Sequence, residues 1–210
     1  MKTASVALLA FLLVWAPAAE AQEGKAFVAG LKSGGYVILI RHGETDRSLL
    51  PREQRKPEPS PMDLANCEMQ AKLTEPGRED ARMIGAAFQS LGIPVAQVLA
   101  SGYCRTMETA RLAFGRAVAS EMLLHPAFAP VPGAGAAPDP YPRRAETLKR
   151  FLATPPPGGS NIVLVSHGEN FRDLFGFEGA TGESLVLKPD GQGGFNLVAR
   201  VLPKAWLAKP

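Results

Sequence analysis

The sequence predicts an α/β fold with a mostly parallel central sheet, and three observations lead to this prediction. Two continuous apolar, β-branched runs, at residues 36–40 and 162–165, have the composition of strands buried on both faces. Helical patterns alternate with a further apolar run between them, which is the order typical of α/β domains. Near the end of the chain, residues 184–188 and 195–202 flank a Pro-Asp-Gly turn and predict a hairpin.

The elements between the two apolar runs are predicted from capping residues and spacing. Thr74 followed by Glu75-Pro76 is typical of a helix start, because threonine caps the first turn and proline is tolerated there. Gly92-Ile93-Pro94 ends that helix. The remaining expectations, in chain order, are a surface loop at 46–67, a strand at 95–100, a helix at 106–114, a surface loop at 127–141 and a helix at 142–153.

The first 21 residues have the features of a secretory signal peptide. Lys2 supplies a positive start, residues 6–16 are apolar but too few to span a bilayer, and Ala19-Glu20-Ala21 is an A-x-A cleavage site. The alternative is an uncleaved anchor or a buried N-terminal helix. We expect residues 1–21 to be removed and residues 22–210 to form a single domain, periplasmic or secreted, with no stable membrane anchor.

Composition limits the classes of function. The chain has 210 residues, of which 46% are hydrophobic and 20% charged, so one folded domain is expected rather than a disordered chain. The formal net charge of +3 fits an anionic substrate but is too small to indicate binding to nucleic acid.

The chain contains two cysteines, Cys67 and Cys104. An oxidising compartment permits a disulfide between them, which would stabilise the fold by about 3–4 kcal/mol in the chain-entropy model. Two separate buried thiols are the alternative, because sequence does not supply the geometry.

Two of the three histidines follow the two apolar runs in the same way. The first run continues into Arg41-His42-Gly43 and the second into Ser166-His167-Gly168. Because the carboxyl ends of parallel strands meet at one edge of a sheet, where ligands bind, we expect His42 and His167 to lie close together. The glycine after each histidine lets another group approach the backbone.

Two arginines are expected at the same edge. Arg41 precedes His42, and Arg105 follows the predicted strand at 95–100. Guanidinium groups bind phosphate oxygens through paired donors, so two arginines and two histidines indicate a phosphoryl pocket. Zinc binding by the histidines is the competing hypothesis, but the arginines would repel a cation and no third ligand has suitable spacing. We expect no metal and no cofactor.

These motifs resemble those of the histidine phosphatase superfamily, in the branch named for phosphoglycerate mutases. The resemblance is carried by Arg41-His42-Gly43-Glu44-Thr45, by Cys104-Arg105-Thr106-Met107-Glu108-Thr109-Ala110 and by Ser166-His167-Gly168. It implies a three-layer sandwich. The export signal and the cysteines are similar to those of small periplasmic members related to lipopolysaccharide core heptose phosphate phosphatases.

The resemblance implies roles for individual residues. His42 is the implied nucleophile, which forms a phosphohistidine, while Arg41, Arg105 and His167 hold the phosphoryl oxygens. The chemistry agrees, because guanidinium charges favour the neutral imidazole that can attack phosphorus and stabilise the transferring group. Thr45 is expected either to add a hydroxyl contact to the substrate or to cap a helix.

The chain also departs from the family pattern. Ser48 stands where many relatives carry asparagine, and residues 123–130 lack the family's glutamate general acid. Glu169 is our choice of proton donor to the leaving group, with Asp139 as the second choice and helix capping as the alternative role of Glu169. We expect Glu121 to lie at the wrong end of its strand for this task. His125 is expected to be structural.

Three functions follow from these residues. The first is an exported phosphoric monoester hydrolase of the histidine acid phosphatase type, acting on a small phosphorylated substrate such as an envelope glycan phosphate. The second is a degenerate member that binds phosphate or a phosphoglycan without turnover. The third, a phosphoglycerate mutase, is disfavoured by the missing acid. The basic segment 47–56 is expected to be a solvated loop, or else a rim that recognises further anionic groups.

Overall fold

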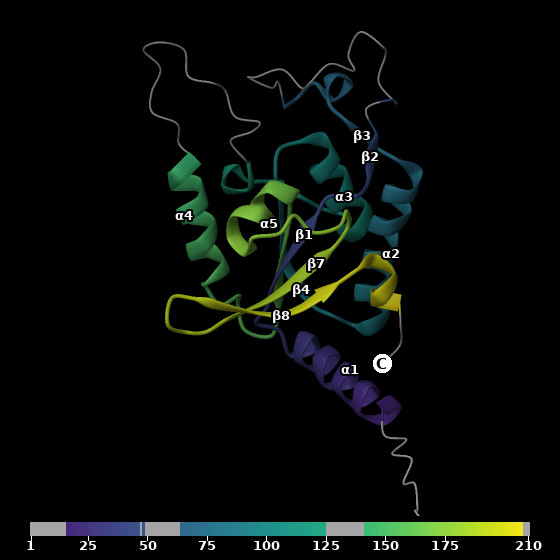
Figure 1. The fold of residues 1–210 in the computed structure, drawn as a ribbon, viewed down its shortest axis with the longest axis vertical. Coiled ribbons are helices and arrows are strands. Elements are labelled where there is room, and N and C mark those ends of the chain that lie inside the picture. The colour runs from purple at the N-terminus through teal and green to yellow at the C-terminus, as the bar shows by residue number, and fades with distance from the viewer. Residues whose placement is uncertain (1–15, 47, 49–63, 125–140, 208–210) are drawn as a thin grey trace, which may run out of the picture.

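A six-stranded sheet in the order β5-β4-β6-β1-β7-β8 forms the centre of the structure. The chain is described by a computed structural model that covers residues 16–46, 48, 64–124 and 141–207 (Figure 1). Four neighbouring strands are parallel: β5 (Val118–Ala119), β4 (Val95–Ala100), β6 (Asn161–Ser166) and β1 (Val37–Arg41). The antiparallel strands β7 (Ser184–Pro189) and β8 (Phe195–Val201) complete the sheet as the predicted hairpin.

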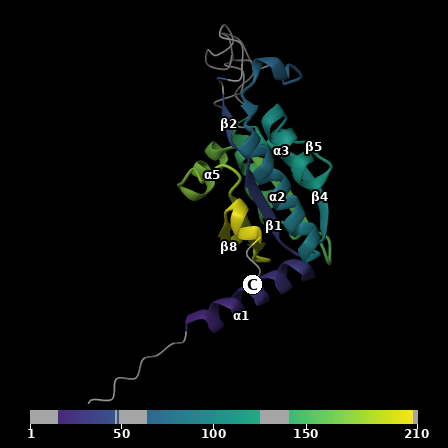
Figure 2. The same ribbon diagram turned by 90° about the vertical axis from the view of Figure 1, so that its right-hand side faces the viewer.

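Helices cover both faces of this sheet, and together they make the predicted three-layer sandwich (Figures 1 and 2). Side chains alternate along the buried strands, so that Ile38 and Ile40 face one layer while Val37 and Leu39 face the other. The first layer contains α1 (Ala16–Ser33), α2 (Glu75–Leu91), α3 (Cys104–Phe114) and the 3₁₀ helix η6 (Pro203–Leu207); the second contains the 3₁₀ helix η4 (Glu121–Leu123), α4 (Tyr141–Leu152) and α5 (Gly168–Phe175).

The helix boundaries follow the capping residues read from the sequence. Thr74 caps α2 by accepting a hydrogen bond from the Gly77 N–H at 3.1 Å. Gly92 ends α2 in the left-handed region at φ 65°, which glycine adopts without steric cost. The main elements predicted from spacing are thus present, although α3 begins at Cys104 rather than at residue 106.

Helix α1 crosses the predicted signal cleavage position at Ala21. Two later residues of α1 join it to the sheet layers: Leu31 is fully buried, and the Phe27 ring lies 6.4 Å from the Trp206 ring. No helix in the described part of the chain is both long and apolar enough to span a bilayer.

A small second sheet lies beyond the carboxyl end of β1. Strand β2 (Thr45–Asp46) pairs antiparallel with β3 (Lys72–Leu73), and the 3₁₀ helix η3 (Cys67–Met69) precedes β3. Thr45 is therefore a strand residue, and its expected alternative role as a helix cap is wrong. The basic segment 47–56 lies outside the described residues except for Ser48.

Candidate active site

His42 and His167 follow two adjacent parallel strands at the same level. Strand β1 pairs with β6 so that Arg41 lies opposite Ser166, and each histidine is the next residue along its chain. The His42 N–H donates to the Ser166 carbonyl at 3.0 Å. The two rings lie 5.5 Å apart between centroids, in an edge-to-face arrangement. The expectation from the matched strand ends is therefore met in the geometry.

The ring of His42 has a defined tautomer. Its Nδ1 lies 2.8 Å from the Gly43 carbonyl oxygen, which can only accept a hydrogen bond. Nδ1 therefore carries the proton, and in the neutral ring Nε2 keeps its lone pair. Nε2 is thus the nitrogen available to attack an electrophile.

His42 stays neutral across a wide range of pH. Its side chain is 7% exposed, and this burial is the largest cause of a pKa lowered to about 3. The charge of Arg105 lowers the pKa further and the charge of Arg41 adds a smaller effect, while the hydrogen bond to Gly43 raises it. A buried, unprotonated imidazole beside two guanidinium groups is suited to nucleophilic attack on an anion.

Arg105 enters the site from the first turn of α3, which follows β4 and a short loop. The residue is 5% exposed, and its guanidinium carbon lies 4.5 Å from the centre of the Tyr103 ring. Thr109, one turn further on, donates to the Arg105 carbonyl at 2.7 Å and accepts from the Gly43 N–H at 3.1 Å. The second threonine of the Arg105 motif therefore ties this arginine to the His42 motif.

His167 is fully buried at the start of α5. A hydrogen bond of 2.8 Å joins its Nε2 to the Ser101 hydroxyl, and its ring lies edge-on to Tyr103 at 5.2 Å between centroids. Ser101 and Tyr103 lie in the loop between β4 and α3. This loop therefore contacts His167 and leads directly into the helix turn that carries Arg105. Ser101 was not among the site residues predicted from the sequence. Its position directly after the predicted strand at 95–100 could have indicated it.

Arg41 points toward the loop between α5 and β7. Its Nη1 donates to the Gly179 carbonyl at 2.6 Å, and its Nη2 lies 3.1 Å from Oε1 of Glu178. No role was predicted for Glu178 from the sequence, because no motif surrounds it. Its ion pair with Arg41 depends on how the loop after α5 folds back.

The glycines of the two His-Gly motifs allow different close approaches. A Cβ on Gly43 would lie 2.6 Å from the Gly77 carbonyl oxygen at the start of α2. A Cβ on Gly168 would lie 2.5 Å from Cγ of Glu178 and 3.0 Å from Cζ of Arg41. The close approach expected at each of these glycines is therefore present. The nearest atoms belong to backbone at Gly43 and to side chains at Gly168.

The candidate proton donors are spread over several elements. Glu169 lies in the first turn of α5, two residues after His167, with its side chain half-buried. Glu121 does not lie at the wrong end of its strand: β5 ends at Ala119 and runs parallel to β4, so Glu121 follows it at the carboxyl edge. Its side chain is exposed and shares a small pocket with Arg143 and Arg144. Asp139 and His125 lie outside the described residues.

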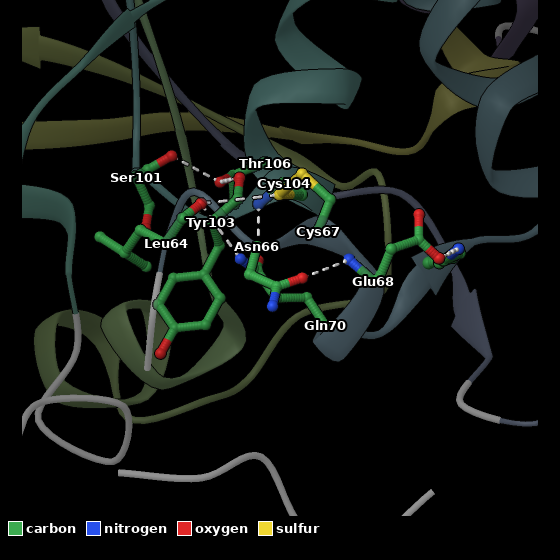
Figure 3. Close-up of a disulfide and its surroundings, with 10 residues drawn as sticks. Leu64, Asn66, Cys67, Glu68, Gln70, Ser101, Tyr103, Cys104 and Thr106 are labelled. Carbon is green, nitrogen blue, oxygen red and sulfur yellow. Dashed lines mark hydrogen bonds and ion pairs between the residues drawn. A yellow bond between two sulfur atoms is a disulfide. The ribbon is translucent and has the colours of Figure 1, made fainter. Parts of the chain in front are cut away.

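The predicted disulfide between Cys67 and Cys104 is present, with a Cα–Cα distance of 5.6 Å. Cys104 is the first residue of α3 and directly precedes Arg105 (Figure 3). The fully buried Gln70 reinforces this link, because its Oε1 accepts from the Cys104 N–H at 2.8 Å (Figure 3). Cross-link and hydrogen bond together fasten segment 64–73 to the turn that carries Arg105.

A pocket of about 490 Å³ lies beside this link and is lined by residues of η3, β3 and α3, Arg105 among them. Its charged lining is largely paired, since Arg78 bonds Glu108 at 2.7 Å and Lys72 bonds Glu68 at 2.8 Å. The described residues contain no group of three or more His, Cys, Asp or Glu side chains arranged to hold a metal ion.

Known proteins share both these motifs and this fold. Residues 37–129 match the model of the histidine phosphatase superfamily (branch 1), and this stretch contains Arg41, His42 and Arg105. Over this stretch the chain is therefore similar to the histidine phosphatase superfamily. A curated relative, the mitochondrial serine/threonine-protein phosphatase Pgam5 of Drosophila willistoni, is 35% identical over 79 residues, which is 38% of this chain and 22% of the relative. The match therefore spans about a fifth of that longer protein.

Solved structures extend the likeness over most of the chain. The ecdysone phosphate phosphatase from Bombix mori, in complex with tungstate, aligns with a TM-score of 0.54 and 14% identity over 79% of this chain and 92% of its own. YhfR from Bacillus stearothermophilus aligns with a TM-score of 0.52 and 19% identity over 78% and 95%. At these identities the likeness concerns the fold, and it confirms the predicted α/β class with its mostly parallel sheet.

Proposed function

We propose that the chain is an exported phosphomonoesterase that works through a phosphohistidine on His42. The observation that carries the proposal is the state of His42, whose neutral Nε2 is buried within reach of the charge of Arg105. Such a nitrogen can bond to phosphorus while the guanidinium group compensates the negative charge of the transferring phosphoryl.

Two displacement steps account for the reaction. In the first, the His42 Nε2 lone pair forms a bond to phosphorus and the P–O ester bond breaks, so that the leaving oxygen departs with its electrons and takes a proton. In the second, water attacks phosphorus, the P–N bond breaks and its electrons return to Nε2. Inorganic phosphate leaves with the oxygen and one hydrogen of the water, and the other hydrogen replaces the proton given to the leaving oxygen. The ring is neutral again because Nε2 has recovered its electron pair.

A turnover assay with matched variants tests the proposal. The protein without residues 1–21 is incubated with p-nitrophenyl phosphate, with and without a chelator, beside His42→Ala. We expect hydrolysis that survives the chelator and is lost in the variant. A phosphoprotein that is labile in acid and stable in alkali should accumulate in the parent during rapid quenching. Activity that persists in His42→Ala would contradict the proposal, and loss of activity with chelator would indicate a metal-dependent reaction.

A binder without turnover is the second candidate. It is favoured by the absence, among the described residues, of a hydrogen bond between a carboxylate and His42, and by the ion pair that already occupies one edge of Arg41. Binding of inorganic phosphate combined with no hydrolysis across a broad panel of phosphomonoesters would support this candidate.

Export and substrate class form the narrower part of the proposal. Recovery of the protein from the periplasm or medium, with Gln22 as its N-terminal residue, would support export and the assigned cleavage site. The proposal that the substrate is an envelope glycan phosphate, such as a core heptose phosphate, rests on the export signal and the cysteines. It predicts a higher kcat/KM for sugar phosphates than for phosphoserine peptides or 3-phosphoglycerate.

A further inference from the structure

Residues 177–183 belong to the loop between α5 and β7 and contact the Arg41 guanidinium. We call this segment the Arg41 cradle. The cradle accepts from both terminal nitrogens of Arg41: the Gly179 carbonyl takes Nη1 at 2.6 Å, and the Glu178 carboxylate pairs with Nη2 at 3.1 Å. A guanidinium held at both ends has its plane fixed, because its donors form a rigid fork.

The third nitrogen of Arg41 has a different environment. Its Nε is buried and has no hydrogen-bond partner among the described residues. A buried donor without an acceptor is unfavourable, and such a group in a native structure calls for a functional explanation. The charge of Arg41 acts on His42, so this guanidinium lies near the proposed nucleophile. A phosphoryl oxygen has the chemistry of such an acceptor.

The cradle itself is anchored by a buried carboxylate. Glu183 is 2% exposed, accepts from the Ala180 N–H at 2.7 Å and pairs with Arg200 at 2.5 Å. Burial alone would raise the pKa of Glu183, but these hydrogen bonds and the charge of Arg200 hold it below its ordinary value. The Arg200 guanidinium in turn lies 3.9 Å from the centre of the Phe177 ring, at the other end of the loop.

Main-chain bonds join the cradle to the end of β1. The Arg41 N–H donates to the Glu183 carbonyl at 3.0 Å, and the Gly182 N–H donates to the Arg41 carbonyl at 3.1 Å. On the outer side, Oε2 of Glu178 accepts from Arg172 of α5 at 2.5 Å. Glu178 therefore bridges two guanidinium groups, that of Arg41, which is partly buried, and that of Arg172, which is exposed.

We propose that Glu178 is a positioning residue, which holds the Nη edge of Arg41 so that its Nε faces a phosphoryl oxygen. The inference rests on the proposed function, because it assigns that oxygen to Arg41. It differs from a competing role in which the Glu178 carboxylate blocks Arg41 and phosphate must displace it. The two roles predict opposite signs for the same substitution.

Binding of inorganic phosphate measures that sign without requiring turnover. In Glu178→Gln the charge is lost while the size is kept, and we expect the Kd for inorganic phosphate, measured by calorimetry, to rise about three- to tenfold. The matched control is Glu146→Gln, which removes another half-exposed ion pair, to Lys149 on α4, and should leave the Kd unchanged. An unchanged or lower Kd in Glu178→Gln overturns the proposal.

A double-mutant cycle separates positioning from a general structural effect. When Arg41→Gln is already present, Glu178→Gln should weaken phosphate binding no further, because its effect acts through Arg41. Additive losses would contradict the proposal. Arg172→Gln serves as a second variant, since it frees the outer side of Glu178 and should raise the Kd by a smaller factor; no change there would also count against it.

Failure of the inference can be told apart from failure of the proposed function. If the parent binds phosphate and the cycle behaves as expected but no phosphomonoester is hydrolysed, Glu178 positions Arg41 in a binder. If the parent hydrolyses phosphomonoesters and Glu178→Gln leaves both the phosphate Kd and KM unchanged, the phosphatase stands and the role of Glu178 falls.

Discussion

The two strand-His-Gly segments, residues 37–43 and 161–168, are alike in sequence and adjacent in the sheet, yet they differ in what surrounds each histidine. Among the described residues, the His42 ring is hydrogen-bonded through Nδ1 to the Gly43 carbonyl, and the charges of Arg105 and Arg41 act on it. His167 caps the start of α5 and has its Nε2 bonded to the Ser101 hydroxyl. A nucleophile needs a free lone pair, and the surroundings supply one at His42.

The partners of the two glycines differ in the same way. Gly43 lies against the backbone of α2, which cannot move without moving the helix, whereas Gly168 lies against the side chains of Arg41 and Glu178. The first segment thus packs against main chain, and the second packs against charged side chains. Sequence similarity between repeated motifs indicates a shared location, while the chemical role depends on neighbours from other elements.

Substitution of each histidine in turn should show the largest difference in activity between the two segments. We expect His42→Asn to lower kcat by about 10³-fold or more, because the nucleophile is removed. His167→Asn keeps the nucleophile, and we expect it to retain transient phosphorylation at a reduced rate. Rapid-quench labelling with a radioactive phosphomonoester measures both, with circular dichroism as the control for folding. Labelling that is lost in His167→Asn and kept in His42→Asn would reverse the assignment.

The proton donor after the second segment should be visible in the choice of leaving group. In Glu169→Gln we expect about a 10²-fold loss of kcat/KM for alkyl phosphates and little loss for p-nitrophenyl phosphate, whose leaving group needs no proton. Glu121→Gln is the matched control, because Glu121 lies at the same edge of the sheet with an exposed side chain. Equal losses for both substrates would remove Glu169 from this role.

Alanine at the two glycines should affect different properties. Gly43→Ala forces a methyl group onto the Gly77 carbonyl, so we expect a loss of about 1–3 kcal/mol in the free energy of unfolding. Gly168→Ala displaces flexible side chains, so we expect a smaller loss of stability together with a higher KM. Denaturant unfolding and steady-state kinetics on both variants measure the contrast. The comparison fails if Gly168→Ala alters stability more than KM.

The lowered pKa of His42 should make the free energy of unfolding depend on pH. Its pKa lies near 3 in the folded chain, below the ordinary value of 6.5, so between these values the unfolded chain binds a proton that the folded chain does not. The His42 contribution to the free energy of unfolding therefore rises with pH in this window, by at most about 1.4 kcal/mol per pH unit, and is lost as the pH falls toward 3. In urea titrations from pH 4 to 7, His42→Asn should show a shallower slope than the parent, and parallel slopes would argue against the low pKa.

The sequence was sufficient to predict the fold and the positions of His42, His167 and Arg105 because each depends on local patterns. Thr74 and Gly92 bound α2 through capping chemistry, and the two apolar runs had to be central strands because neither has a polar face. The placement of His42, His167 and Arg105 then followed from the rule that parallel strands end at one edge.

What escaped prediction depends on contacts between distant segments. Glu178 reaches Arg41 because the loop after α5 turns back, and no periodicity records that turn. The position of Glu121 relative to its strand was predicted incorrectly, because β5 is only two residues long and gives almost no apolar signal. The cap of α3 comes from Gln70, thirty-four positions away, where sequence rules look for a neighbouring side chain.

The sheet order has a consequence for how the protein is made. Strand β6 lies between β1 and β4, so these two strands from the first hundred residues are joined only through β6, whose first residue is Asn161. Until β6 pairs with them, both facing edges present unpaired backbone groups, which are prone to pair with other chains. The insertion of β6 joins these two strands and brings His167 beside His42 in the same event, before β7 and β8 extend the sheet. Folding of this protein should therefore be slow relative to its size, and recovery of activity should coincide with the last cooperative folding phase.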